Sequence, residues 1–116
     1  MFLKLMKSKL HRARVTETKL HYPGSIAIDS ALMEAVGIIP YENVLIADLT
    51  NGNRLETYVV PAQPNMGEII VLGAAAQLIN KNDIVIIIAF GYFTPDEARA
   101  HKPKVVVLDE KNEIKH

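Results

Sequence analysis

Short runs of β-branched and other apolar residues, separated by turn residues, restrict the fold of this chain more than any other feature. Strand-sized runs occur at 2–6, 10–16, 25–28, 44–49, 54–60, 68–72, 84–90 and 105–108. Many short strands with Gly, Pro or Asn between them are typical of a small barrel or sandwich. The pattern therefore predicts a mostly β protein, in which the first two runs are separate strands or one bent strand.

Turn and capping residues define the connections. Asn51-Gly52 predicts a hairpin, because both residues tolerate positive φ. Asp29 and Gly37 are placed to cap and end a short helix over 30–36, and the capping box 94–97 predicts another that ends near residue 100. Residues 73–76 predict a helical turn. The uniformly apolar run 84–90 predicts a strand buried on both faces, and 109–116 a polar tail.

Length and composition bound the class of protein. A chain of 116 residues predicts a single domain, 1–116. Thirteen basic and thirteen acidic residues balance, which argues against a nucleic-acid partner. The chain has no cysteine and no metal-ligand spacing, so we expect no disulfide and no metal. The longest apolar run is too short for a bilayer and lysines interrupt the first residues, so we expect a cytoplasmic protein without a membrane partner.

Gly24-Ser25 is the candidate for unusual chemistry. Taken alone, this dipeptide is most often a turn. Glycine also lets a side chain approach its carbonyl closely, so the Ser25 hydroxyl could attack the Gly24 carbonyl and convert the amide into an ester. Elimination of that ester and hydrolysis would leave a pyruvoyl group at position 25. The residues alone leave both interpretations open.

Several sequence blocks together resemble the bacterial aspartate 1-decarboxylases. The blocks are 7–13, 20–29, 50–54, 57–58, 73–76, 83–87 and 101–103. They cover nearly the whole chain with their spacing preserved, so the resemblance is far more specific than any single block.

The resemblance implies a six-stranded double-psi β-barrel with two or three short helices, assembled as a homotetramer. It implies a precursor that cleaves itself between Gly24 and Ser25 into 1–24 and 25–116, with a pyruvoyl cofactor made from Ser25. The implied reaction converts L-aspartate to β-alanine and CO2, on the way to pantothenate. Decarboxylation of an amino acid needs an electron sink, which a pyruvoyl ketone would supply by condensing with the substrate amine.

Three side chains are candidates for substrate binding and proton transfer. The planar fork of Arg54 matches a carboxylate. Taken alone, Arg54 is more often a surface residue beside the hairpin, but its spacing from Asn51-Gly52 and Thr57-Tyr58 matches the family and favours substrate binding. Lys9 could supply a second positive charge, or could be an ordinary exposed strand lysine. The resemblance implies that Tyr58 is the catalytic proton donor, and its phenol is protonated at neutral pH. From the residues alone, it could also be a core aromatic.

Two further segments are implied to bind substrate. Thr57 matches a threonine that supports cleavage and contacts substrate, and Gly73-Ala74-Ala75 could present backbone N–H groups to a carboxylate or could simply pack tightly. Thr57 and Tyr58 are adjacent, so on a regular strand they point to opposite faces. Either a bulge or a site at a subunit boundary would resolve this, and we prefer the boundary.

One residue departs from the family pattern. Leu72 stands where most members have asparagine, so a group that donates and accepts hydrogen bonds is replaced by an aliphatic one. Two alternatives therefore stay open: a non-catalytic β-barrel that binds a partner, and a decarboxylase of another acidic amino acid. His11 and His21 have no acidic partner in the pattern and receive no role.

Overall fold

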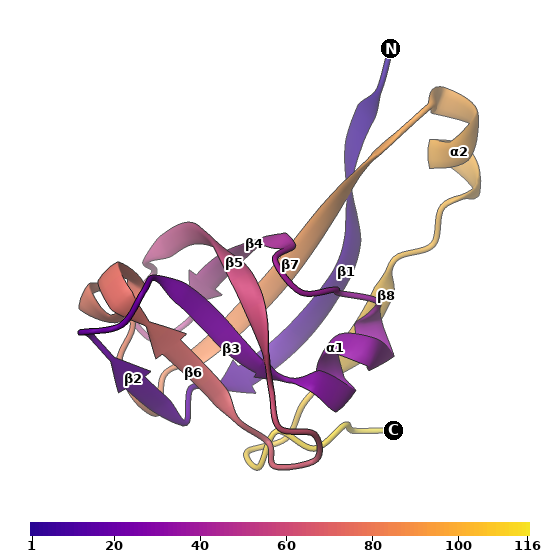
Figure 1. Ribbon diagram of the computed structural model, residues 1–116. Coiled ribbons are helices and arrows are strands. Elements are labelled where there is room, and N and C mark those ends of the chain that lie inside the picture. The colour runs from indigo at the N-terminus through magenta and orange to yellow at the C-terminus, as the bar shows by residue number, and fades with distance from the viewer.

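The computed structural model describes residues 1–116 as a mostly β protein (Figure 1). Eight strands, two α-helices and one 3-10 helix follow one another along the chain. In order they are β1 (Leu3–Arg14), β2 (Glu17–Lys19), β3 (Ser25–Asp29), α1 (Ser30–Val36), β4 (Asn43–Asp48), β5 (Arg54–Ala62), β6 (Ile69–Leu72), η1 (Gly73–Gln77), β7 (Ile84–Phe93), α2 (Pro95–Ala100) and β8 (Lys104–Val107).

All strands belong to one sheet of order β2-β6-β3-β5-β4-β7-β1-β8. The long antiparallel pair β1 and β7 extends well beyond the other strands, and the N-terminus and α2 lie at its far end (Figure 1). Irregularities at Met6/Ser8 and Leu10/Ala13 bend β1. Of the two predictions for the N-terminal segment, one bent strand is therefore the correct one.

The predicted turns and caps are confirmed. β4 and β5 pair antiparallel around the Asn51-Gly52 turn, where Gly52 has φ +79°. The Asp29 side chain accepts from the backbone N–H of Ala31 at the start of α1, and Gly37 ends this helix in the left-handed conformation. Thr94 and Glu97 form a complete capping box at α2. Neither α-helix is long and apolar enough to cross a membrane.

A single cluster of 20 buried apolar residues fills the space inside the sheet. The prediction that 84–90 is buried on both faces is wrong, because only Val85, Ile87 and Ala89 of this run are buried and the intervening residues are half-buried. β7 therefore has one core face and one apolar face that the chain itself covers only in part.

The residues that follow β1 connect this strand, next to one edge of the sheet, to β6, next to the other edge. The backbone N–H of Thr16 donates to the Ile69 carbonyl at 2.8 Å. The Ile69 N–H in turn donates to the Thr16 hydroxyl oxygen at 3.0 Å. β2 then pairs with β6 in parallel. β2 was not predicted, because three polar residues carry no strand pattern. Without the short outer strands β2 and β8, six strands remain in the sheet.

The C-terminal segment is more ordered than a polar tail. Asn112 is buried, its side-chain amide donates to the carbonyls of Arg14 and Gly67 at 2.8 Å each, and its oxygen accepts from the Arg14 N–H. Leu108 forms an isolated bridge with Ile114. Asn112 therefore ties the last residues to the end of β1 and to the β5–β6 loop.

Candidate active site

The Gly24–Ser25 bond lies where an exposed loop enters the sheet. Residues 20–24 are exposed, whereas every residue of β3 is buried and Ser25, its first residue, is only 3% exposed. Ser25 pairs with Leu72 of β6. The hydroxyl-bearing residue is therefore held by the sheet, while Gly24 belongs to the loop.

The backbone of Gly73 packs directly on the backbone of Gly24. A Cβ atom added to Gly73 would lie 2.5 Å from the Gly24 Cα, 2.7 Å from its nitrogen and 2.7 Å from the Tyr22 carbonyl oxygen. Gly73 also has φ +71°, a conformation that side chains disfavour. Only glycine allows η1 to begin this close to the predicted cleavage site.

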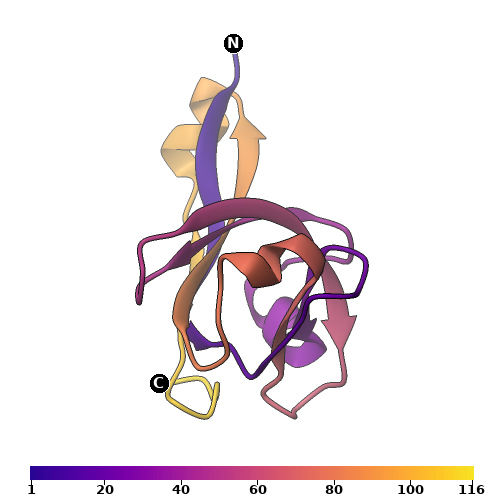
Figure 2. The same cartoon turned by 90° about the vertical axis from the view of Figure 1, so that its left-hand side faces the viewer.

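A cavity of about 250 Å³ opens beside Gly24. Thr57 lines it from β5, and Ala74 and Ala75 line it from η1, which faces the viewer in Figure 2. The backbone nitrogen of Ala74 lies 4.0 Å from where a Gly24 Cβ would be. Four of the predicted site residues thus surround one space. The other lining residues are Leu55, Glu56 and Leu78.

The sequence pattern did not single out these three additional residues. Leu55 could have been found from Thr57, because residues two apart on a strand share a face. Leu78 follows η1 and carried no signal. A larger cavity of about 490 Å³ lies between the start of α1 and the C-terminal segment, but none of the predicted site residues lines it.

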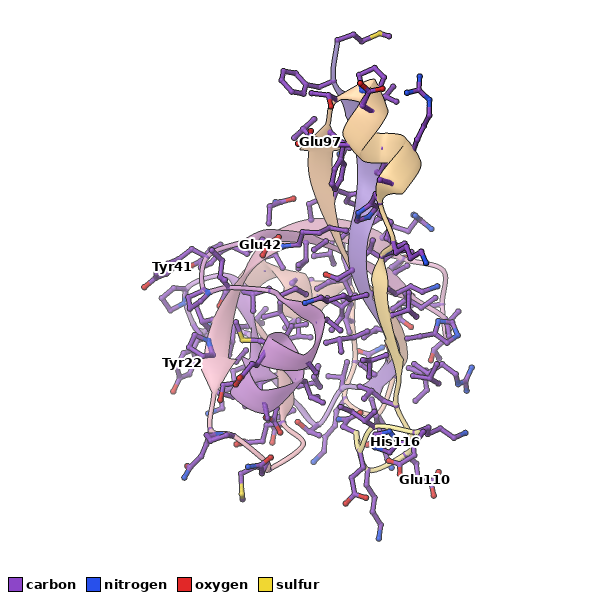
Figure 3. The ribbon with its side chains drawn as sticks, turned by 90° about the vertical axis from the view of Figure 1, so that its right-hand side faces the viewer. Tyr22, Tyr41, Glu42, Glu97, Glu110 and His116 are labelled. Carbon is purple, nitrogen blue, oxygen red and sulfur yellow. The ribbon has the colours of Figure 1, made fainter.

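Tyr58 does not line the Gly24 cavity. The pairing of β4 with β5 is regular from Arg54 to Tyr58, so no bulge turns Thr57 and Tyr58 to one face. Tyr58 is 38% exposed, and its ring lies 6.2 Å from the ring of Tyr41, centroid to centroid. Tyr41 itself projects outward from the molecule (Figure 3). The bulge is therefore absent, and the subunit boundary stays a prediction.

Lys9 and Arg54 also lie away from the cavity, on the outer face of the sheet. Lys9 pairs with Ile88, Ile88 with Leu45 and Leu45 with Glu56, so these four side chains form one row across four strands. The next row runs from Arg54 through Ala47 to Ile86. Arg54 and Lys9 form no ion pair within the chain.

The middle of this outer face is apolar and incompletely covered. Leu45, Ala47, Ile86, Ile88 and Phe90 are all half-buried. They lie between Lys9 at one side and the residues of β5 at the other. We call these five residues the outer apolar face.

His11 lies on β1 near Lys9. Burial lowers the pKa of His11, and the charges of Lys9 and Arg12 lower it further. Its Nδ1 atom is buried without a hydrogen-bond partner. The imidazole is therefore predominantly neutral at pH 7.

Leu72 lies directly opposite Ser25. Directly paired residues of neighbouring strands project to the same face, so the aliphatic side chain lies beside the serine. The departure from the family pattern thus falls next to the predicted cleavage site. No group of three or more His, Cys, Asp or Glu residues is placed to hold a metal ion.

Comparison with known proteins decides the family. The model of the family described as aspartate decarboxylase matches residues 1–115. The chain belongs to the aspartate decarboxylase family.

Curated relatives agree with this assignment, and one solved structure resembles the chain in fold. Aspartate 1-decarboxylases of Listeria monocytogenes and Acetivibrio thermocellus are 53% identical over 98% of this chain and 90% of theirs. The Bacillus licheniformis protein of that name is 49% identical over the same shares. The rationally designed mkDPBB_sym1 protein, a double-psi β-barrel, matches 75% of this chain and 99% of its own with a TM-score of 0.50 and 18% identity. The family resemblance inferred from the sequence is thus confirmed.

Proposed function

We propose that this member of the aspartate decarboxylase family cleaves itself between Gly24 and Ser25 and then decarboxylates L-aspartate to β-alanine and CO2. The observation that supports the proposal is the contact of Gly73 with Gly24, because the start of η1 then lies beside the bond that we propose is cleaved. The cavity beside this contact is the substrate site. The product β-alanine would serve pantothenate synthesis in the cytoplasm.

Cleavage uses groups that surround the bond. The Ser25 hydroxyl attacks the Gly24 carbonyl carbon, the C–N bond breaks, and Gly24 becomes an ester of the serine oxygen. Elimination then leaves a Gly24 carboxylate, and hydrolysis releases ammonia and leaves a pyruvoyl group at position 25. Thr57, which lines the same cavity as Gly24, is suited to stabilise the oxyanion formed during the attack.

The residues around Gly24 fit a pyruvoyl-dependent reaction on a small substrate. When present, the pyruvoyl group supplies the electron sink that decarboxylation requires. The cavity of about 250 Å³ lies just below the range of about 300–1,000 Å³ typical of drug-sized ligands, which suits a four-carbon amino acid. Ala74 and Ala75 present backbone there without bulky side chains, and Gly73-Ala74-Ala75 would bind a substrate carboxylate.

Arg54, Lys9 and Tyr58 would reach a substrate across a boundary between copies. All three lie outside the Gly24 cavity, and Lys9 and Arg54 flank the outer apolar face. An apolar sheet face that is half-buried in one copy favours burial against another. We propose a homotetramer in which Arg54 grips a substrate carboxylate, Lys9 adds positive charge and Tyr58 returns the proton.

The sheet is proposed to close as a six-stranded double-psi barrel made of β1 and β3–β7. The hydrogen bonds between Thr16, just after β1, and Ile69 of β6 support closure, because β6 and β1 are the outer members of these six strands. The likeness to a designed double-psi barrel supports the same architecture.

Substrate turnover tests this function. The purified protein is incubated with L-aspartate or L-glutamate, and released CO2 and the amine product are measured. We expect turnover of aspartate that greatly exceeds that of glutamate. Preferred turnover of glutamate would instead assign another acidic substrate. No turnover of either by a chain that also stays intact would favour a non-catalytic barrel.

The variant Tyr58→Phe is expected to cleave normally and to lose about 100-fold or more in kcat, because it lacks the phenolic proton. Tyr41→Phe is the matched control, since the two rings are neighbours and only Tyr58 is assigned a proton transfer. Steady-state kinetics and denaturing mass spectrometry measure the two effects separately. Equal kcat values in the two variants would remove Tyr58 from the mechanism.

A further inference from the structure

Two buried carboxyl groups meet at the closed end of the β4–β5 hairpin. Asp48 ends β4 and is 2% exposed, and Asp83 immediately precedes β7 and is 6% exposed. Asp48 pairs with Val85, and Asp83 lies two residues before Val85, so the two carboxyl groups are diagonal neighbours on one face of the sheet. The Asp48 Oδ1 accepts from the Thr50 N–H at 2.8 Å, and the Asp83 Oδ2 accepts from the Asn80 N–H at 2.9 Å.

One oxygen of this pair has no partner unless a proton is present. The Asp48 Oδ2 is buried and accepts no hydrogen bond from the chain. Two ionised carboxylates in contact in a buried site repel each other, whereas one shared proton converts the contact into a hydrogen bond. Burial first, and the Asp83 carboxyl second, raise the pKa of Asp48 to about 6.

No neighbouring cation neutralises the pair. The elements packed around it contribute Arg14, Lys81 and Arg54, and none of them forms an ion pair with either aspartate. The Arg14 guanidinium instead binds the side-chain oxygen of Asn82 at 3.0 Å. The charge of a doubly ionised pair would therefore stay uncompensated.

The pair joins two segments that border the proposed substrate site. The side-chain amides of Asn51 and Asn53 both donate to the Leu78 carbonyl, at 3.1 and 2.8 Å. Leu78 lines the Gly24 cavity, and Arg54 directly follows the hairpin turn. The position of the turn relative to the Leu78 end of η1 thus affects both the cavity and Arg54.

We infer that Asp48 and Asp83 share one proton, and that this proton holds the Arg54-bearing hairpin against the Leu78 end of the cavity. They are positioning residues, because neither lines the cavity. The claim that the proton positions Arg54 for substrate binding rests on the proposed function. The claim that the two carboxyl groups share a proton does not.

The sign of the pH effect follows from the direction of the shift. A carboxyl whose pKa is higher in the folded state than its ordinary value of 3.8 binds its proton more tightly when folded. Its contribution to stability is complete below pH 3.8 and is lost as the pH rises through about 6. Over this window, loss of the proton raises the unfolding equilibrium constant.

The variant Asp48→Asn tests the shared proton. Its amide nitrogen donates permanently to the Asp83 carboxylate, while its oxygen can still accept from Thr50, so its hydrogen bonds do not depend on pH. Melting temperatures of the purified wild-type and variant proteins are compared from pH 4 to pH 8 at one protein concentration. Asp96→Asn is the control, because it removes the same charge from an exposed residue of α2.

For each variant, the measured quantity is its melting temperature minus that of the wild type. We expect this difference to rise between pH 4 and pH 7 for Asp48→Asn and to stay constant for Asp96→Asn. Taking the difference cancels other titrating groups, such as Asp29 and His11. A difference for Asp48→Asn that is flat, or that falls, would overturn the shared proton.

Kinetics test the positioning role. From pH 5.5 to 7.5, the KM for L-aspartate should rise more steeply in the wild type than in Asp48→Asn, while kcat follows the same pH profile in both. If the KM profiles were identical while the melting difference followed the expectation, the claim that the proton positions Arg54 would be overturned. The pair would then contribute to stability only. If neither protein turns over aspartate, the proposed function fails, and the melting experiment still decides the shared proton.

Discussion

Ser25→Ala is expected to yield a single intact chain that releases no CO2 from aspartate. The methyl group has no oxygen to attack the Gly24 carbonyl, so neither the ester nor the pyruvoyl group can form. Ser25 is buried at the start of β3, and alanine fits this space, so the variant should fold. Denaturing mass spectrometry and a CO2-release assay on the same preparation measure both losses.

Ser8→Ala is the matched control for this experiment. It makes the same chemical change at a buried serine of β1, whose hydroxyl has no hydrogen-bond partner. We expect Ser8→Ala to cleave and to turn over aspartate like the wild type. If Ser25→Ala still produced β-alanine, the source of the electron sink would have to lie elsewhere in the chain.

Gly73→Ala is expected to slow cleavage by about a hundredfold or more, because a displacement of about 1 Å at a reacting centre can cost this much. The added Cβ would lie 2.5 Å from the Gly24 Cα, and the contacting atoms are backbone atoms that cannot rotate away. Gly24 must therefore shift relative to Ser25, or η1 must move and change the cavity. The cleaved fraction over time in freshly purified, folded protein is the measurement.

Gly52→Ala separates backbone strain from this contact. Gly52 has φ +79°, close to the +71° of Gly73, but nothing lies within 4 Å of its added Cβ. The left-handed conformation costs a side-chain-bearing residue about 1–2 kcal/mol, so both variants should lose at least this much stability. Gly73→Ala should lose more, because its Cβ also meets backbone atoms. Only Gly73→Ala should lose cleavage. Equal cleavage rates in the two variants would contradict the role assigned to the Gly73–Gly24 contact.

The features that sequence predicted well depend on neighbouring residues. The β4–β5 hairpin follows from Asn51-Gly52, and the α2 capping box from Thr94 and Glu97, because these structures form over a few consecutive positions. Strand alternation also predicted correctly that Thr57 and Tyr58 face opposite sides. The family resemblance added information that no local pattern contains, including the prediction that the chain is cleaved between Gly24 and Ser25.

The features that sequence did not predict depend on contacts between distant residues. Nothing local to Gly73 indicates that it packs on Gly24, and nothing local to Asp48 indicates that a second carboxyl lies beside it. The apolar run of β7 predicted burial on both faces, because a face that packs only partly within one chain has the same composition as a core face. Contacts of this kind can be identified only from the three-dimensional structure.

The intact masses of the purified wild-type protein under denaturing conditions test the central claim most directly. Self-cleavage at Gly24–Ser25 predicts two chains, 1–24 and 25–116, whose summed mass equals that of the precursor with one water gained and one ammonia lost. Ordinary proteolysis at the same bond would gain one water and lose no ammonia. A single full-length mass after prolonged incubation, or two chains with the proteolytic sum, would contradict a pyruvoyl group made from Ser25.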